Sequence, residues 1–169
     1  MSRMRTATLA TTLLAALAVG VGAPALTSAQ TNAAQSRSSH NGWGNHCQRS
    51  FAHAVQDYRE TTFDKDADGF NDLLHRDVSA IFADGSTLLG KQATAGFIDS
   101  FFADDEWTQT LDVVHTEVDD CRSGFVLFDS VYTPSPTTAG VALAIGVTFT
   151  FESGEWKVLH NQDSDGPVS

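Results

Sequence analysis

The chain has 169 residues, of which 41% are hydrophobic and 18% are charged, and its formal net charge is −11 at pH 7. This length predicts one domain with enough apolar residues for a sizeable core. Asp and Glu outnumber Lys and Arg by 21 to 10, and the basic residues form no cluster. We therefore expect no nucleic-acid partner and no attraction to an anionic membrane, since both require a basic face.

Residues 1–29 have the three parts of a secretory signal peptide. Arg3 and Arg5 give a basic start, residues 6–21 form an uncharged stretch rich in Ala and Leu, and small residues precede a cleavage site after Ala29. A retained membrane anchor is the alternative, but Thr, Gly and Ala make the stretch less apolar than a membrane span requires. We expect Sec-dependent export, because no paired arginines precede the stretch, and a secreted product without membrane attachment.

Both cysteines of the chain, Cys47 and Cys121, lie beyond this cleavage site. In an oxidising compartment two cysteines form a disulfide more often than they stay free. A catalytic or metal-binding pair has little support, because neither a CxxC motif nor a Cys/His spacing is present. The sequence predicts one structural disulfide.

Residues 30–46 are rich in Ser, Asn, Gln and Gly and show no periodicity, which is typical of a flexible tail. From Cys47 onward the pattern becomes helical. Residues with helical spacing form one face, at positions i, i+4, i+7 and i+11: Phe51, Val55, Tyr58 and Thr62. We predict that the first helix begins near Cys47.

A shorter second helix is predicted to start at Asp66 or Asp68 as its N-cap. Its apolar residues are Phe70, Leu73 and Leu74. A short strand over residues 78–83 follows, and it ends in an Asp-Gly turn at Gly85. Gly90 then precedes a third helix with a broad apolar face, formed by Phe97, Ile98, Phe101 and Phe102.

The rest of the chain has strand periodicity. Three long apolar runs and one shorter run are separated by turn residues, and they span residues 107–118, 124–132, 141–152 and 156–161. The third run alternates cleanly, with apolar side chains at every second residue from Val141 to Phe151. We predict an α+β domain over residues 47–165, with three N-terminal helices on one face of a curved, mainly antiparallel sheet, and a short tail over residues 166–169.

Several strings in this order resemble the nuclear transport factor 2-like (NTF2-like) superfamily. They are FDKDADGF at 63–70, LLHRDV at 73–78, ADG at 83–85, GK at 90–91 and GEWKVLHN at 154–161. The resemblance is greatest to the SnoaL-like branch, including the SgcJ/EcaC-type proteins of actinomycetes, and it covers about residues 47–163.

This resemblance implies a cone-shaped fold in which a strongly bent sheet and three helices enclose an apolar pocket. It also implies a homodimer formed through the outer face of the sheet. Proteins of this superfamily include isomerases, dehydratases, cyclases, epoxide hydrolases and binding or assembly modules, so the fold alone does not define the function.

The motif Asp64-x-Asp66-x-Asp68-Gly69 opens like an EF-hand calcium loop. Such a loop needs a bidentate Glu at its twelfth position, where this chain has His75. We interpret the motif as an acidic helix start whose Asp side chains cap exposed N–H groups, and we expect no metal site. Weak calcium binding with a structural role is the alternative.

A candidate catalytic site rests on which strand faces point inward. If the faces with Leu111, Phe125 and Trp156 line the pocket, ionisable groups share an apolar cavity: His115, Asp129 and His160. Burial of such groups is costly unless they pair or take part in chemistry.

One of these histidines would then act as a general base, with Asp129 orienting the other, and Tyr58 would donate a hydrogen bond to a developing oxyanion. Packing is the alternative role for each of these side chains.

Two functions remain open at this stage. The first is non-redox acid/base chemistry, such as isomerisation, dehydration or cyclisation, on a small apolar molecule. The second is a non-catalytic ligand-binding or dimeric assembly module. No nucleotide fingerprint and no redox-cysteine motif occurs in the sequence, so we expect no cofactor.

Overall fold

A computed structural model describes the backbone of residues 29–169 and the side chains of residues 45–169. The predicted signal peptide, apart from its last residue, lies outside the described residues. Within this described part, no helix combines the length and the apolar character needed to cross a membrane.

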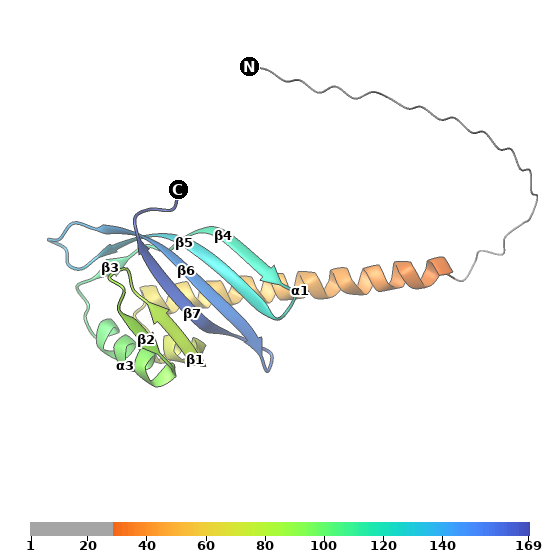
Figure 1. The fold of residues 1–169 in the computed structure, drawn as a ribbon, viewed down its shortest axis with the longest axis horizontal. Coiled ribbons are helices and arrows are strands. Elements are labelled where there is room, and N and C mark those ends of the chain that lie inside the picture. The colour runs from red at the N-terminus through yellow and green to blue at the C-terminus, as the bar shows by residue number, and fades with distance from the viewer. Residues whose placement is uncertain (1–28) are drawn as a thin grey trace, which may run out of the picture.

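The described part of the chain contains three helices, and two strands lie between the second helix and the third. The helices are α1 (Ala29–Phe63), α2 (Ala67–Leu73) and α3 (Lys91–Phe102). Figure 1 shows that the second half of α1 runs along the sheet, whereas its first half projects beyond the domain. Residues 30–46, which we expected to form a flexible tail, are helical. No proline interrupts the chain between Ala29 and Phe63, and each added turn extends a helix that is already nucleated on the core.

The acidic motif before α2 serves as a helix cap. Asp66 is the N-cap residue, and its Oδ1 accepts a hydrogen bond of 3.0 Å from the backbone N–H of Gly69. A side-chain oxygen at this position satisfies one of the free N–H groups of the first turn. The predicted capping role is confirmed. Leu74, which we expected to lie on the apolar face of this helix, begins the first strand instead.

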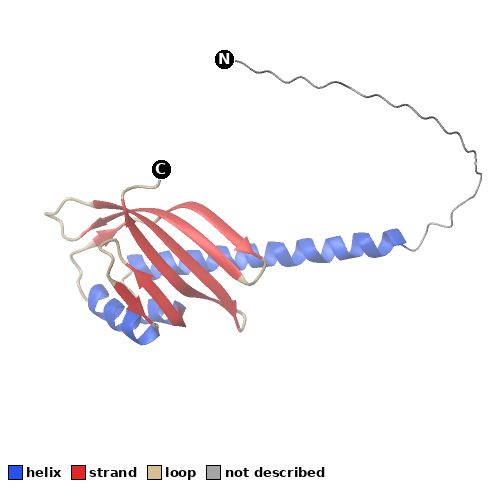
Figure 2. Ribbon diagram, viewed as in Figure 1, coloured by secondary structure: helices blue, strands red, loops and turns tan. Residues whose placement is uncertain are grey.

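The strands form one seven-stranded sheet in the order β2-β1-β7-β6-β5-β3, with β4 also paired to β5. Their bounds are β1 (Leu74–Ile81), β2 (Thr87–Leu89), β3 (Thr108–Gln109), β4 (Asp112–Asp119), β5 (Ser123–Thr133), β6 (Val141–Glu152) and β7 (Glu155–Asp165). All pairs are antiparallel except β1 with β7. Figure 2 shows the helices packed against this sheet. The α+β class and the mainly antiparallel sheet are confirmed.

The core lies between α1 and the inner face of the sheet. On α1, the predicted face is buried, with Phe51, Val55 and Tyr58 each at most 7% exposed. On β6, the alternation predicted from the sequence is confirmed, since the buried side chains are those of Leu143, Ile145, Val147 and Phe149.

A disulfide joins Cys47 to Cys121, with their Cα atoms 5.2 Å apart, and this confirms the predicted pair. It fastens α1 to the turn between β4 and β5. Gly124 follows this turn, and a Cβ atom at that position would overlap the ring of Phe51. The glycine therefore permits the close approach of α1 and β5.

Candidate functional site

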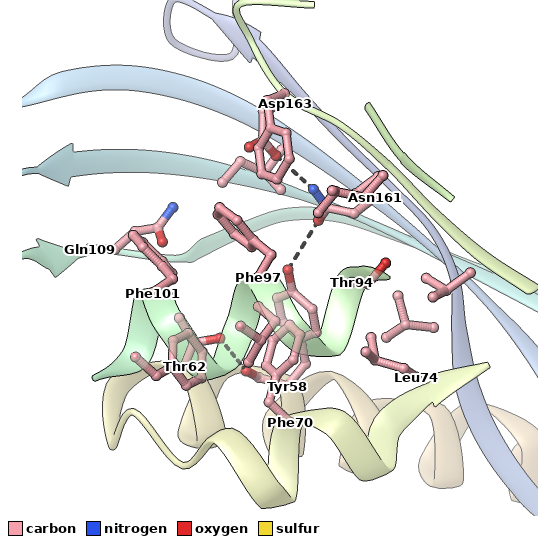
Figure 3. Close-up of a pocket in the computed structure, with 18 residues that line it drawn as sticks. Tyr58, Thr62, Phe70, Leu74, Thr94, Phe97, Phe101, Gln109, Asn161 and Asp163 are labelled. Atoms are coloured by element: carbon pink, nitrogen blue, oxygen red, sulfur yellow. Dashed lines mark hydrogen bonds between the residues drawn. The ribbon is translucent and has the colours of Figure 1, made fainter. Parts of the chain in front are cut away.

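A cavity of about 90 Å³ opens between the three helices and the inner face of the sheet. Figure 3 shows side chains from α1, α2, α3 and several strands pointing into it. Most of the lining is apolar and aromatic, and it includes Phe70, Phe97, Ile98, Phe101 and Phe102. Known pockets for drug-sized ligands measure about 300–1,000 Å³, so this cavity fits a smaller molecule unless its walls move.

Three of the polar side chains that line the cavity are joined by hydrogen bonds. The hydroxyl of Tyr58 donates to Oδ1 of Asn161 over 3.1 Å, and Nδ2 of Asn161 donates to Oδ1 of Asp163 over 2.8 Å. Both bonds are drawn in Figure 3. Tyr58 comes from α1, whereas Asn161 and Asp163 come from β7, so the cluster links the first helix to the last strand.

Burial changes the acidity of both ends of this cluster. Desolvation raises the pKa of the Asp163 carboxyl, and the hydrogen bond from Asn161 opposes that rise only in part. The pKa of Tyr58 is also raised, first by burial and second by the nearby negative charge of Asp163. The hydroxyl thus keeps its proton at neutral pH, while the carboxyl is a stronger base than an exposed aspartate.

Aromatic side chains of α3 form the wall opposite the cluster. Phe97 lies with its ring centroid 4.9 Å from that of Phe82 and 5.4 Å from that of Phe101. Phe101 in turn stacks on Trp107 at 4.3 Å. Because Phe97 is 37% exposed, it is the ring of this wall closest to solvent.

Of the four predicted catalytic residues, Tyr58 lines the cavity, and the other three lie on the outer face of the sheet. The prediction that His115, Asp129 and His160 share an interior site is therefore wrong. Their placement follows from the strand register, which is described strand by strand below.

On β5 the inward face is the one that carries Val126 and Phe128, both fully buried. Asp129 pairs with Ala144 on the outer face of β6, and its Oδ1 accepts a hydrogen bond of 3.2 Å from the backbone N–H of Val168. Both faces of β5 carry large apolar residues, so the sequence pattern did not distinguish them.

On β7 an irregularity moves the side chains between faces. Val158 pairs with Phe149 and is buried. Thr148, which precedes Phe149 on β6, pairs with His160 and not with Leu159. One extra residue on β7 at this point shifts the alternation, as in a β-bulge. His160 consequently points to the outer face, where its Nδ1 lies 2.8 Å from Oγ of Ser79.

The same bulge turns Asn161 and Asp163 inward, and these are the two functional candidates that the sequence reasoning missed. They pair with Val147 and Ile145, both on the inner face of β6. A period-two count along β7 assigns them to the outer face. The one sequence signal for them is that two polar residues, two positions apart, follow the apolar part of the last strand.

His115 lies on β4, where it pairs with Leu127 on the outer side of β5. Its side chain is 58% exposed and lies 4.0 Å from Glu117. Because solvent surrounds this ring, the burial argument that suggested a catalytic role does not apply to it.

The described residues contain no group of three or more His, Cys, Asp or Glu side chains placed to hold a metal ion. The polar cluster of the cavity itself offers proton transfer at a carboxyl group and hydrogen-bond donation from a phenol.

The fold is shared with solved structures of the NTF2-like family. A candidate dehydratase of that family from Streptomyces avermitilis has 16% identity and a TM-score of 0.60 over 71% of this chain and 96% of its own. An uncharacterised protein with a cystatin-like fold from Caulobacter vibrioides has 14% identity and a TM-score of 0.61 over 72% and 90%. A candidate calcium/calmodulin-dependent protein kinase type II association domain from Thiobacillus denitrificans has 20% identity and a TM-score of 0.56 over 69% and 93%.

The family model of the SnoaL-like domain matches residues 55–159, and the chain belongs to this family. The matched region begins in α1 and ends within β7, so it contains β1 to β6, the first part of β7 and most of the cavity lining, whereas Asn161 and Asp163 lie just beyond it. No curated protein matches the chain. The resemblance seen in the sequence is thus confirmed at the level of the SnoaL-like and NTF2-like families.

Proposed function

We propose that this chain is a secreted SnoaL-like protein that carries out non-redox acid/base chemistry on a small apolar molecule, of the isomerase, dehydratase or cyclase type. One observation carries the proposal: the carboxyl of Asp163 lies in an aromatic-lined cavity and is connected to the phenol of Tyr58 through Asn161. The resemblance to the SgcJ/EcaC-type branch is part of this proposal.

In this mechanism Asp163 accepts a proton from a carbon next to a substrate carbonyl, and Tyr58 turns its O–H from Asn161 to the oxyanion that forms. The proton then returns from Asp163 to a different atom in an isomerisation, or to a departing hydroxyl in a dehydration. A carboxyl with a raised pKa suits both directions of transfer, since it accepts and releases a proton nearer to neutral pH. Asn161 positions Asp163 by holding Oδ1, which leaves Oδ2 for the substrate.

The second candidate is a non-catalytic ligand-binding or assembly module, and one observation favours it. The phenol of Tyr58 already donates to Asn161. A cluster whose hydrogen bonds are satisfied internally can also serve to orient a bound ligand without reacting with it.

The test compares Asp163→Asn with Asp129→Asn, because both remove one carboxylate but only the first lies in the cavity. Small cyclic ketones and hydroxyketones are screened first by thermal shift and then, for every compound that stabilises the protein, by NMR for turnover and for exchange of the α-proton with D₂O.

Acid/base chemistry predicts that exchange or turnover falls at least 100-fold in Asp163→Asn and stays unchanged in Asp129→Asn. A ligand-binding module predicts stabilisation without exchange, and that outcome would replace the first candidate by the second. Equal loss in both variants would contradict a site at Asp163.

Export is the remaining part of the proposal. The signal-like residues 1–29 and the Cys47–Cys121 disulfide both suit an oxidising compartment. We expect N-terminal sequencing of the product in culture medium to start at Gln30. Recovery of the chain in cells with Met1 intact would contradict export.

A further inference from the structure

A second hollow, of about 450 Å³, lies between α1 and β4. Among the described residues, it shares no lining side chain with the cavity at Asp163. Its volume falls within the range of known small-molecule sites, and it is larger than the cavity. We call it the α1–β4 groove.

The groove is elongated because its α1 residues follow one face of the helix from Gln48 to Arg59. At 1.5 Å per residue this face is roughly 17 Å long. Between its ends the lining is largely apolar, with Phe51 and Val55 from α1 and Val113 from β4. Val113 is 45% exposed, so apolar surface on the strand side is open to a ligand.

A single guanidinium group, that of Arg59, lies at one end of this face. Its Nε is buried and has no hydrogen-bond partner, and its Nη1 donates to Oε1 of Gln56 over a long 3.3 Å. Among the described side chains, none of the ion pairs involves Arg59. Buried donors are nearly always paired, and a guanidinium presents N–H groups in a fork that matches a carboxylate.

The cation also has an aromatic neighbour. Its Cζ lies 5.7 Å from the ring centroid of Phe63, which is 46% exposed. This contact helps to hold the guanidinium at the end of the groove. The site therefore combines a cation that has no ion-pair partner among the described side chains with a partly apolar face about three helical turns long.

We propose that the α1–β4 groove binds a monocarboxylate with an unbranched alkyl chain, with the carboxylate on Arg59 and the chain along Val113 toward Gln48. A carboxylate supplies acceptors for the guanidinium N–H groups of Arg59, which lines the groove, and the alkyl chain removes apolar surface from water. This binding site is separate from the acid/base cavity and does not depend on its chemistry.

The negative charge of the protein helps to distinguish specific binding of a carboxylate from nonspecific binding of an amphiphile. With a formal net charge of −11, nonspecific binding of amphiphiles would favour a cationic headgroup over an anionic one. A preference for the carboxylate thus requires a local cation, and Arg59 is the one that lines the groove.

The experiment is a calorimetric titration of the purified protein with sodium decanoate below its micelle concentration, with decyltrimethylammonium and decanol as matched probes. Three variants are compared with the wild type. Arg59→Gln removes the cation, Thr116→Trp fills the groove, and Arg76→Gln is the control, since Arg76 is an exposed arginine on β1 paired with Asp77.

We expect saturable binding of decanoate at one site, at least tenfold tighter than either probe. Arg59→Gln and Thr116→Trp should each weaken it at least tenfold, and Arg76→Gln should leave it unchanged. Three results would overturn the proposal: no saturable binding, tighter binding of the cationic probe, or equal affinity in wild type and Arg59→Gln. Circular dichroism of each variant establishes that it is folded, and Arg59→Met replaces Arg59→Gln if that variant does not fold.

Discussion

The carboxyl of Asp163 is held in the interior by a hydrogen bond from Asn161, and burial raises its pKa. A carboxyl with a higher pKa in the folded chain than in the unfolded chain binds its proton more tightly when folded. Its contribution to stability is therefore complete below the unfolded pKa, about 3.9, and is lost as the pH rises through the folded pKa.

Asp163→Asn should accordingly raise the melting temperature at pH 7 by a few degrees, because the neutral amide keeps the acceptor for Asn161 and removes a partly desolvated charge. The gain should shrink as the pH falls toward 4, because the native carboxyl then takes up its proton. Differential scanning calorimetry from pH 4 to pH 8 measures both effects. Asp129→Asn, on the outer face, should show neither of them.

A lower melting temperature of Asp163→Asn at pH 7 would contradict this account, since it would mean that the ionised carboxylate stabilises the fold. Combined with the activity assay, the prediction has a functional meaning. A residue whose replacement stabilises the protein but abolishes proton transfer is retained at a cost to stability, which is typical of active sites.

At the scale of the elements, the sequence was most informative where one face of a strand is uniformly apolar. On β6 the apolar residues from Val141 to Phe151 defined the inner face, and the structure agrees. The N-cap at Asp66 and the third helix after Gly90 were likewise predicted, because these signals are local.

The residues of the candidate site required a different kind of information. On β5, Phe125 and Leu127 are as apolar as Val126 and Phe128, so hydrophobicity did not identify the inner face. The inner face of β5 is set by its pairing register with β6, and that register depends on contacts between the two strands. On β7 the bulge after Val158 reverses the alternation, and no residue type marks it in the sequence.

The disulfide is the element-scale feature with the largest expected effect on stability. It closes a loop with a sequence separation of 74 residues, and loop-closure entropy assigns such a cross-link about 4 kcal/mol. We expect the double variant Cys47→Ala/Cys121→Ala to melt roughly ten degrees below the oxidised wild type.

Thermal unfolding with and without dithiothreitol provides the control. The reductant should lower the melting temperature of the wild type toward that of the double variant and should leave the double variant unchanged. If the oxidised wild type and the double variant melt together, the cross-link contributes nothing to the folded state, and the packing of α1 at Phe51 carries the attachment alone.

At the scale of the whole molecule, the outer face of the sheet is less polar than a solvent-facing surface usually is. Val131 lies on this face and is 44% exposed. A shallow hollow of about 340 Å³ lies on the same face, with Phe125, Leu127 and His160 in its lining. Contiguous apolar surface on a strongly acidic protein suits association with another chain.

We propose that this face forms the homodimer, with Leu127 near its centre. A charge placed there would be desolvated on association and left without a partner, which disfavours the complex strongly. Leu127→Glu should therefore reduce the mass measured by light scattering after size exclusion from that of two chains to that of one.

Leu89→Glu is the matched control, because Leu89 is 75% exposed on β2 at the far edge of the sheet. The mass of this variant should remain that of the wild type. A wild-type mass of one chain, or a dimer that survives Leu127→Glu, would show that this face is not the interface. Because His160 lies on it, the dimer would also place that histidine between subunits, which gives a structural role to a side chain that the sequence had suggested for catalysis.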